Sequence, residues 1–186
     1  MKKTIILILV ITLSYSCKAQ IVPIEKMVDY IDEGNGVPEN TTYIKDVNNL
    51  LDKFVGVWKG SADGKTFELR IVKYTEDSYG IKEDLLLMRH IIKNSNGTVI
   101  KNTTTLANSN VLVSSGNYLE KNGTYVLNYV SDDEKCGQTG DIFINVTSNQ
   151  MLFSYNKDFG LNDPDECPNG KVPQIFPKVQ FTLTKQ

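Results

Sequence analysis

The sequence predicts an all-β protein in which an antiparallel meander of about eight or nine strands, entered by a short N-terminal helix, closes into a barrel. Apolar and polar residues alternate in several segments after Val55, and tight-turn dipeptides separate these segments. A single meandering sheet of this length must also cover its edges and its apolar face, which closure achieves. A two-sheet β-sandwich is the alternative.

The first 17 residues have the pattern of an export signal. Lys2 and Lys3 precede an apolar run from Ile5 to Leu13, and small or polar residues then lead to Cys17. This run is shorter than the roughly 20 residues that a membrane-spanning helix needs. We therefore expect an exported protein whose signal segment is removed.

Two processing routes fit the end of this signal. In the first, Cys17 is diacylated, becomes the new N-terminus and anchors the protein to a membrane. In the second, cleavage after Ala19 releases a soluble form that begins at Gln20. The position of a cysteine just past the apolar run favours lipidation. The expected location is the outer membrane, the periplasm or the exterior of a Gram-negative bacterium.

Composition indicates one exported globular domain. The chain is 23% charged and 40% apolar, and loss of Lys2 and Lys3 leaves 18 basic against 22 acidic side chains. This balance gives no basic surface for nucleic acid. Residues 18–43 show no sustained period and contain Gly34, Gly36 and Pro38, so we expect a linker there and a single domain over 44–186.

A short helix is expected directly before the strands. Asp46 is placed to cap its N-terminus, and the spacing of Val47, Leu50, Leu51 and Phe54 puts these four side chains on one face.

The remaining segments read as strands joined by turns. Clear alternation marks Phe67–Val72, Asp141–Val146 and Val179–Thr184. Further strands are expected at Val55–Lys59, Leu85–Lys93, Thr98–Leu106, Val111–Tyr118, Thr124–Val130 and Met151–Tyr155. Turns are expected at Asp63-Gly64, Asn96-Gly97 and Asn122-Gly123, because these residues tolerate the positive φ of tight hairpins.

The segment Gly56-Val57-Trp58, at the first of these strands, resembles the glycine-x-tryptophan signature of lipocalin-like (calycin) barrels. In that family the tryptophan closes one end of the barrel behind a short helix. The family also places an arginine near the last strand, where this chain has only Lys178 and Lys185.

A second resemblance covers nearly the whole chain. The segments Ser16–Gln20, Tyr43–Asn49 and Leu51–Trp58 are similar to a family of small exported, lipoprotein-like proteins of Bacteroidetes-type bacteria, catalogued as a domain of unknown function. The resemblance implies export and a β-rich domain, and it implies no activity.

The cysteine count predicts one disulfide. Either processing route disposes of Cys17, which leaves Cys136 and Cys167 as a pair in an oxidising compartment. Two separate thiols are the alternative.

That disulfide would bring two acidic clusters together. Hard oxygen ligands of this kind suit Ca²⁺, although two solvated acidic turns explain the pattern equally. The candidate ligands are Asp132, Asp133, Glu134, Asp163, Asp165 and Glu166. No other cofactor is expected.

The second cluster lies in a long segment without strand period, Asn156–Pro177, which holds four of the six prolines. Loops of this length are often functional, so we expect a lid or a partner-binding surface at one end of the barrel.

The sequence does not favour an enzyme. His90 is the only histidine, which excludes a three-histidine zinc site. A Gly-x-Ser-x-Gly elbow, a phosphate-binding glycine loop and a Cys-x-x-Cys pair are all missing from the sequence.

Two non-enzymatic functions remain open. The first is an envelope protein that binds a small apolar ligand inside the barrel. Its lining would comprise Trp58, Phe67, Leu69, Leu127, Phe153 and Phe181, which could equally fill a solid core. The second is a structural or interaction module that contacts an envelope protein through its loops.

Overall fold

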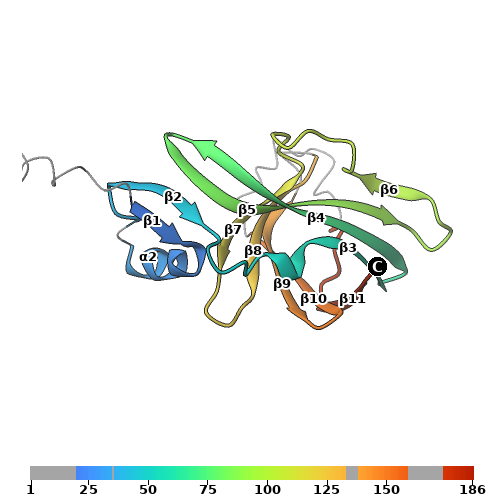
Figure 1. Ribbon diagram of the computed structural model, residues 1–186. Helices are drawn as coiled ribbons and strands as arrows, with labels where there is room; N and C mark the ends of the chain where they lie inside the picture. The colour runs from blue at the N-terminus through green and yellow to red at the C-terminus, as the bar shows by residue number, and fades with distance from the viewer. Residues whose placement is uncertain (1–19, 35, 133–137, 159–173) are drawn as a thin grey trace, which may run out of the picture.

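The computed structural model describes residues 20–34, 36–132, 138–158 and 174–186. The N-terminal part comprises β1 (Gln20–Pro23), the 3-10 turn η1 (Ile24–Lys26), helix α2 (Met27–Glu33) and β2 (Thr41–Lys45). A second 3-10 turn, η2 (Asp52–Phe54), leads to the strands β3 (Gly56–Ala62), β4 (Lys65–Ser78), β5 (Ile81–Lys93), β6 (Val99–Asn102), β7 (Ser114–Leu119), β8 (Tyr125–Val130), β9 (Thr139–Thr147), β10 (Gln150–Lys157) and β11 (Phe181–Lys185) (Figure 1).

Eight of these strands form a closed antiparallel barrel. Hydrogen bonding runs in the order β5-β4-β3-β11-β10-β9-β8-β7, and β7 returns to β5. The closing register pairs Leu87 with Ser115 and Met88 with Ser114. This pairing confirms the predicted barrel, because a sandwich would leave β5 and β7 in separate sheets.

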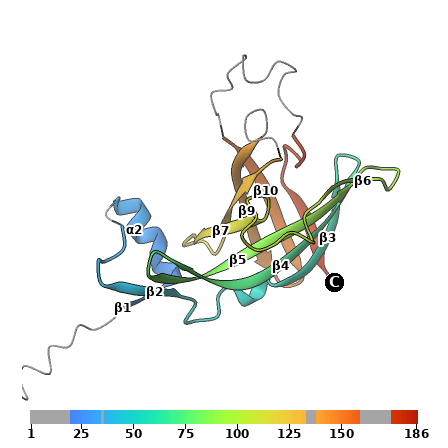
Figure 2. The ribbon, with the colours of Figure 1, turned by 90° about the horizontal axis from the view of Figure 1, so that it is seen from above.

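Strand β5 pairs with other strands along both of its edges. One edge pairs with β4 from Ile81 to Lys93. The other edge pairs in turn with β2 near Lys82, with β7 near Leu87 and with β6 near Ile92. The N-terminal strands and β6 therefore extend the barrel sheet at opposite ends of the long β4–β5 hairpin (Figure 2).

A tyrosine fills the gap where β5 changes partners. The amide of Leu86 lies between the β2 and β7 pairings and donates a hydrogen bond to the Tyr125 hydroxyl at 3.2 Å. The Tyr125 ring occupies the space that a side chain on Gly116 would need, since a Cβ there would lie 2.0 Å from the hydroxyl oxygen. A residue larger than glycine at position 116 would therefore displace the Tyr125 ring.

The range 18–43, where the sequence predicts a linker, contains β1, η1, α2 and the start of β2 from Gln20 onward. These elements have no visible period, since helix α2 has seven residues and buries only Val28. Strand β1 pairs in parallel with β2, and β2 in parallel with β5. Their stability comes from distant partners that local pattern does not reveal.

The helix expected after Asp46 is likewise shorter than predicted. The Asp46 carboxylate accepts hydrogen bonds from the amides of Leu50 and Leu51 at 2.7 and 3.1 Å, four and five residues ahead, whereas an N-cap contacts the amides two or three residues ahead. Asn49 also has a φ of 54°, which interrupts a right-handed helix. Only the η2 turn at Asp52–Phe54 is helical, and Val47 faces solvent.

The predicted strands are confirmed, but several boundaries differ: β4 runs on to Ser78, β5 already begins at Ile81, and β11 begins at Phe181. The strand expected over Thr98–Leu106 ends at Asn102, and the strand expected from Val111 begins at Ser114. Residues 103–113 between them form successive turns.

Candidate functional site

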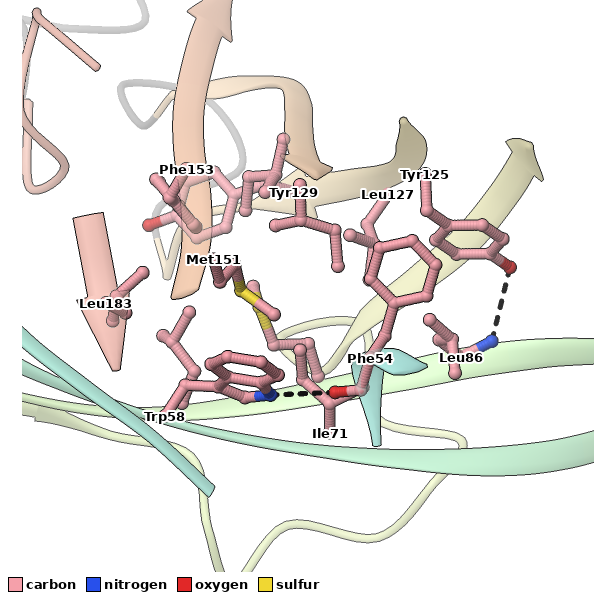
Figure 3. Close-up of a cluster of buried hydrophobic side chains, with 14 of the residues drawn as sticks. Phe54, Trp58, Ile71, Leu86, Tyr125, Leu127, Tyr129, Met151, Phe153 and Leu183 are labelled. Atoms are coloured by element: carbon pink, nitrogen blue, oxygen red, sulfur yellow. Dashed lines mark hydrogen bonds between the residues drawn. The ribbon is translucent and has the colours of Figure 1, made fainter. Parts of the chain in front are cut away.

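The six predicted barrel-lining residues all belong to one buried core. Their exposed fractions lie between 0% and 8%, and they comprise Trp58, Phe67, Leu69, Leu127, Phe153 and Phe181. Figure 3 shows Trp58, Leu127 and Phe153 within one cluster of buried side chains. The sequence therefore identified which side chains point inward.

Several aromatic rings pack against one another in one part of this interior. Phe176, which is 2% exposed, lies among the rings of Tyr129, Phe153 and Tyr155 at centroid distances of 5.0, 5.1 and 5.6 Å. The ring of Phe67 lies 6.3 Å away. Phe176 belongs to the long proline-rich segment, so part of that predicted loop contributes to the core. The one local signal for this role is the apolar pair Ile175-Phe176.

His90 also points into this interior. It is 0% exposed, and its ring lies 5.6 Å from the ring of Phe176. In the described part of the chain, neither of its ring nitrogens has a hydrogen-bond partner. Burial, and next the positive charge of Lys101, lower the pKa of His90 to about 4, with Asp132 acting in the opposite direction. The ring is therefore neutral at pH 7, and no described carboxylate is hydrogen-bonded to it, as a catalytic triad would require.

The predicted disulfide and most of the predicted calcium ligands lie outside the described residues. The predicted lipidation site, Cys17, lies outside them as well. The residues concerned are Cys17, Cys136, Cys167, Asp133, Glu134, Asp163, Asp165 and Glu166. The described residue Asp132 pairs with the ammonium of Lys101. Next to the two undescribed segments, the amide of Asp158 donates to the carbonyl of Thr139 at 2.9 Å, so their flanking residues are neighbours. The disulfide and the calcium site stay predictions.

A groove lies on the outer face of the barrel, beside β4 and β5. Its volume is about 290 Å³. We call it the outer groove; its lining consists of Tyr74, Glu76, Leu85, Leu87, Asn108, Ser109, Asn110, Val111, Val113, Ser115 and Val130. Leu85, Leu87 and Val113 form an apolar cluster separate from the barrel core. Val111 is 61% exposed at its rim. The size is near the lower limit for a specific binding site.

Arg89 holds the far wall of the outer groove in place. Its guanidinium donates two hydrogen bonds to the carbonyl of Leu106, at 3.1 and 3.0 Å, and one to the Asn108 side chain at 2.6 Å. Thr103 joins the same turns to β5 through a 2.9 Å hydrogen bond from its amide to the carbonyl of His90. The groove is therefore built from a clamped loop and a rigid sheet.

One end of the outer groove is acidic. Glu76 and Glu83 are directly opposite each other on β4 and β5, on the same face as Tyr74 and Leu85. Burial, and next the Glu76 carboxylate, raise the pKa of Glu83. Among residues whose positions are described, no Lys or Arg forms an ion pair with either carboxylate. A cationic group bound there would relieve their repulsion.

A buried polar network joins β2 to the β4–β5 hairpin. Asp84 accepts hydrogen bonds from the hydroxyls of Tyr43 and Thr75 at 2.8 and 2.7 Å, and from the amide of Asp46 at 3.1 Å. Burial acts to raise the pKa of Asp84, but these hydrogen bonds and the charge of Lys73 lower it overall. Lys73 also pairs with Asp46 at 2.8 Å. The network positions the N-terminal elements, so its role is structural.

Two further features bear on possible sites. No helix in the described parts of the chain has the length and apolar character needed to cross a membrane. The same residues contain no group of three or more His, Cys, Asp or Glu side chains placed to hold a metal ion.

Comparison with known proteins supplies a family and no activity. Neither the curated proteins nor the solved structures contain a match to this chain. One protein-family profile does match, and it covers residues 1–159, which is most of the sequence. The chain belongs to this family, the family of unknown function DUF6705.

Proposed function

We propose that this protein is a non-catalytic component of a bacterial cell envelope, exported and anchored by lipid at Cys17, that binds a partner polypeptide through the outer groove. The observation that carries the proposal is the contrast between the two sides of the barrel wall. Aromatic side chains occupy the described interior around Phe176, whereas the outer groove is a depression open to solvent, lined by both polar and apolar side chains.

The chemistry of the outer groove suggests the kind of partner. Leu85, Leu87 and Val113 offer an apolar floor, and Glu76 and Glu83 offer two negative charges at one end. An apolar segment that carries a lysine or arginine matches both features. Lysine and arginine side chains beside apolar residues are common on protein surfaces. A small uncharged ligand has no positive charge to pair with Glu76 and Glu83.

The alternative expected from the sequence is a small apolar ligand inside the barrel. The packing of Phe176 against Tyr129 and Phe153 weighs against it, because a ligand would have to displace these rings. Native mass spectrometry after mild extraction separates the two functions. A retained lipid-like mass would support the interior ligand and contradict the groove proposal.

Photo-crosslinking in the producing cells tests the outer groove directly. A benzophenone amino acid replaces Val111, which is 61% exposed at the groove, and in a control it replaces Val179, which is 66% exposed elsewhere. We expect a discrete protein adduct from position 111 and none from position 179. We also expect Glu76→Gln with Glu83→Gln to weaken that adduct. Equal adducts from both positions, or none from position 111, would refute the proposal.

A further inference from the structure

The start of the fold lies very close to the proposed lipid anchor. Only Lys18 and Ala19 separate Cys17 from Gln20, where β1 begins. The Gln20 amide is fixed by a 3.1 Å hydrogen bond to the carbonyl of Asn40. Three residues span at most about 11 Å when fully extended. An acylated Cys17 would therefore hold β1 against the bilayer surface, since the polar layer of a leaflet is only about 5–7 Å thick.

The tip of the β4–β5 hairpin lies at the same end of the molecule. Gln20 pairs with Thr41, and Tyr43 pairs with Lys82 in a parallel register, which places Thr41 level with Gly80. Two strand spacings then put Gln20 about 10 Å from the hairpin tip. Both views show β1, β2 and this tip on one side and β6 on the other (Figures 1 and 2).

Tyr79 occupies that tip in an unusual way. Its side chain is fully exposed, with a relative accessibility of 104%, and its φ is 53°. A bulky residue is rare in this left-handed conformation, which asparagine and glycine normally supply in tight hairpins. Such an outlier at an exposed turn calls for a function of the side chain itself.

The surroundings of Tyr79 favour a lipid interface over an electrostatic contact. Tyrosine joins an apolar ring to a polar hydroxyl and is enriched at membrane interfaces. Ile21, on β1 at the same end, is 51% exposed. Among the residues that the structure describes, the exposed charges nearby include Asp77 and Glu39 against Lys82, which form no basic patch for anionic headgroups.

We infer that the start of β1 and the tip of the β4–β5 hairpin form the membrane-facing end of the protein, with the Tyr79 ring in the bilayer interface. The inference rests on the proposed lipid anchor. It orients the long axis of the β4–β5 hairpin away from the membrane. The β6 end, paired near Lys93, then lies farthest from the lipid, about 35 Å along β5 from Lys82.

Quenching by brominated lipid tests this orientation. The acylated full-length mature protein is reconstituted into phosphatidylcholine vesicles with or without bromine on the acyl chains. Tyr79→Trp reports on the hairpin tip, and Val99→Trp, on β6, is the control. Trp58 is the only native tryptophan and is 0% exposed, so it supplies a constant background.

We expect bromine to quench Tyr79→Trp roughly twofold more than Val99→Trp. The quenching should be insensitive to anionic lipid. Ile21→Trp should be quenched like Tyr79→Trp, and it replaces Tyr79→Trp as the reporter if that variant folds poorly. Its site is matched to the control, because Ile21 is 51% exposed and Val99 is 49% exposed. Equal quenching at both ends of an acylated protein would overturn the orientation alone. An intact mass without acyl chains at Cys17 would overturn the lipid anchor and the orientation together.

Discussion

The ammonium nitrogen of Lys185 lies 5.2 Å from the centre of the Trp58 ring. The same lysine side chain explains why position 56 is a glycine. A Cβ there would lie 2.9 Å from the Lys185 side chain, and Gly56 has a φ of 134°. The indole nitrogen of Trp58 donates to the carbonyl of Phe54 at 2.8 Å (Figure 3). The side chain of Lys185, on the last strand, therefore covers Trp58.

Replacing Lys185 with alanine should lower the free energy of unfolding by about 1 kcal/mol, because the cation–π contact and the cover of Trp58 are lost. Lys178→Ala is the matched control, since Lys178 is exposed and makes no described contact with Trp58. Urea denaturation followed by Trp58 fluorescence measures both. Equal midpoints for the two variants would contradict the role of Lys185.

Phe176→Ala should destabilise the protein by about 3–5 kcal/mol, because it leaves a large cavity among five aromatic rings. Val179→Ala, three residues later at a side chain that is 66% exposed, should change stability by less than about 0.5 kcal/mol. Chemical denaturation at pH 7 distinguishes them. A small effect of Phe176→Ala would mean that the stability of the barrel does not depend on this side chain.

His90 should make the protein acid-sensitive. Its pKa is about 4 in the folded state and 6.5 when unperturbed, so the unfolded chain binds the proton more tightly. The contribution of His90 to the free energy of unfolding is fully present above pH 6.5. It is lost as the pH falls towards 4, which lowers that free energy by at most about 3 kcal/mol. His90→Leu should remove this part of the pH dependence. Unfolding midpoints at pH 7 and pH 4.5 for both proteins provide the measurement, and identical pH slopes would count against it.

Asp84→Asn should loosen the N-terminal elements. Asparagine keeps the size of the side chain but weakens the hydrogen bonds from Tyr43 and Thr75 and removes the charge near Lys73, at a cost of about 2 kcal/mol. Hydrogen exchange should speed up first in β2. Asp77→Asn, on the exposed part of the same hairpin, should leave exchange in β2 unchanged. Uniform acceleration across the barrel would show that β2 does not unfold separately.

The predicted link between Cys136 and Cys167 is checked by mass. Non-reducing digestion should yield one peptide pair joined through these residues. Cys136→Ser with Cys167→Ser should lower stability by about 3–4 kcal/mol, because the unfolded chain gains the freedom of a loop of some 30 residues. Two free thiols in the mature protein would refute the link.

Local pattern was enough to predict the barrel. The alternation of Phe67, Leu69 and Ile71 matches their burial on β4 at 2%, 0% and 1% exposure. The Asp63-Gly64 and Asn122-Gly123 pairs lie in the turns between β3 and β4 and between β7 and β8. These features depend on neighbours in the chain, which is why the sequence alone determined them.

The N-terminal elements and the groove depended on contacts between distant residues. Strand β2 pairs with β5 some forty residues away, as at Tyr43 and Lys82, so no local period marks it. Val113 meets Leu85 and Leu87 only because Arg89 clamps the intervening turns. Phe176 reaches the core from a segment without strand pattern.

The sequence by itself predicted the fold class and the inward-facing residues, and the expectation of an export signal that ends at Cys17 rests on the sequence alone. Only the tertiary structure decided that the interior around Phe176 is occupied by side chains and that an apolar groove lies outside the barrel. It also placed the start of β1 at the same end of the molecule as the tip of the β4–β5 hairpin. The physical reason is that alternation encodes which face of a strand is buried, whereas filling a barrel and joining its ends depend on side chains far apart in the chain.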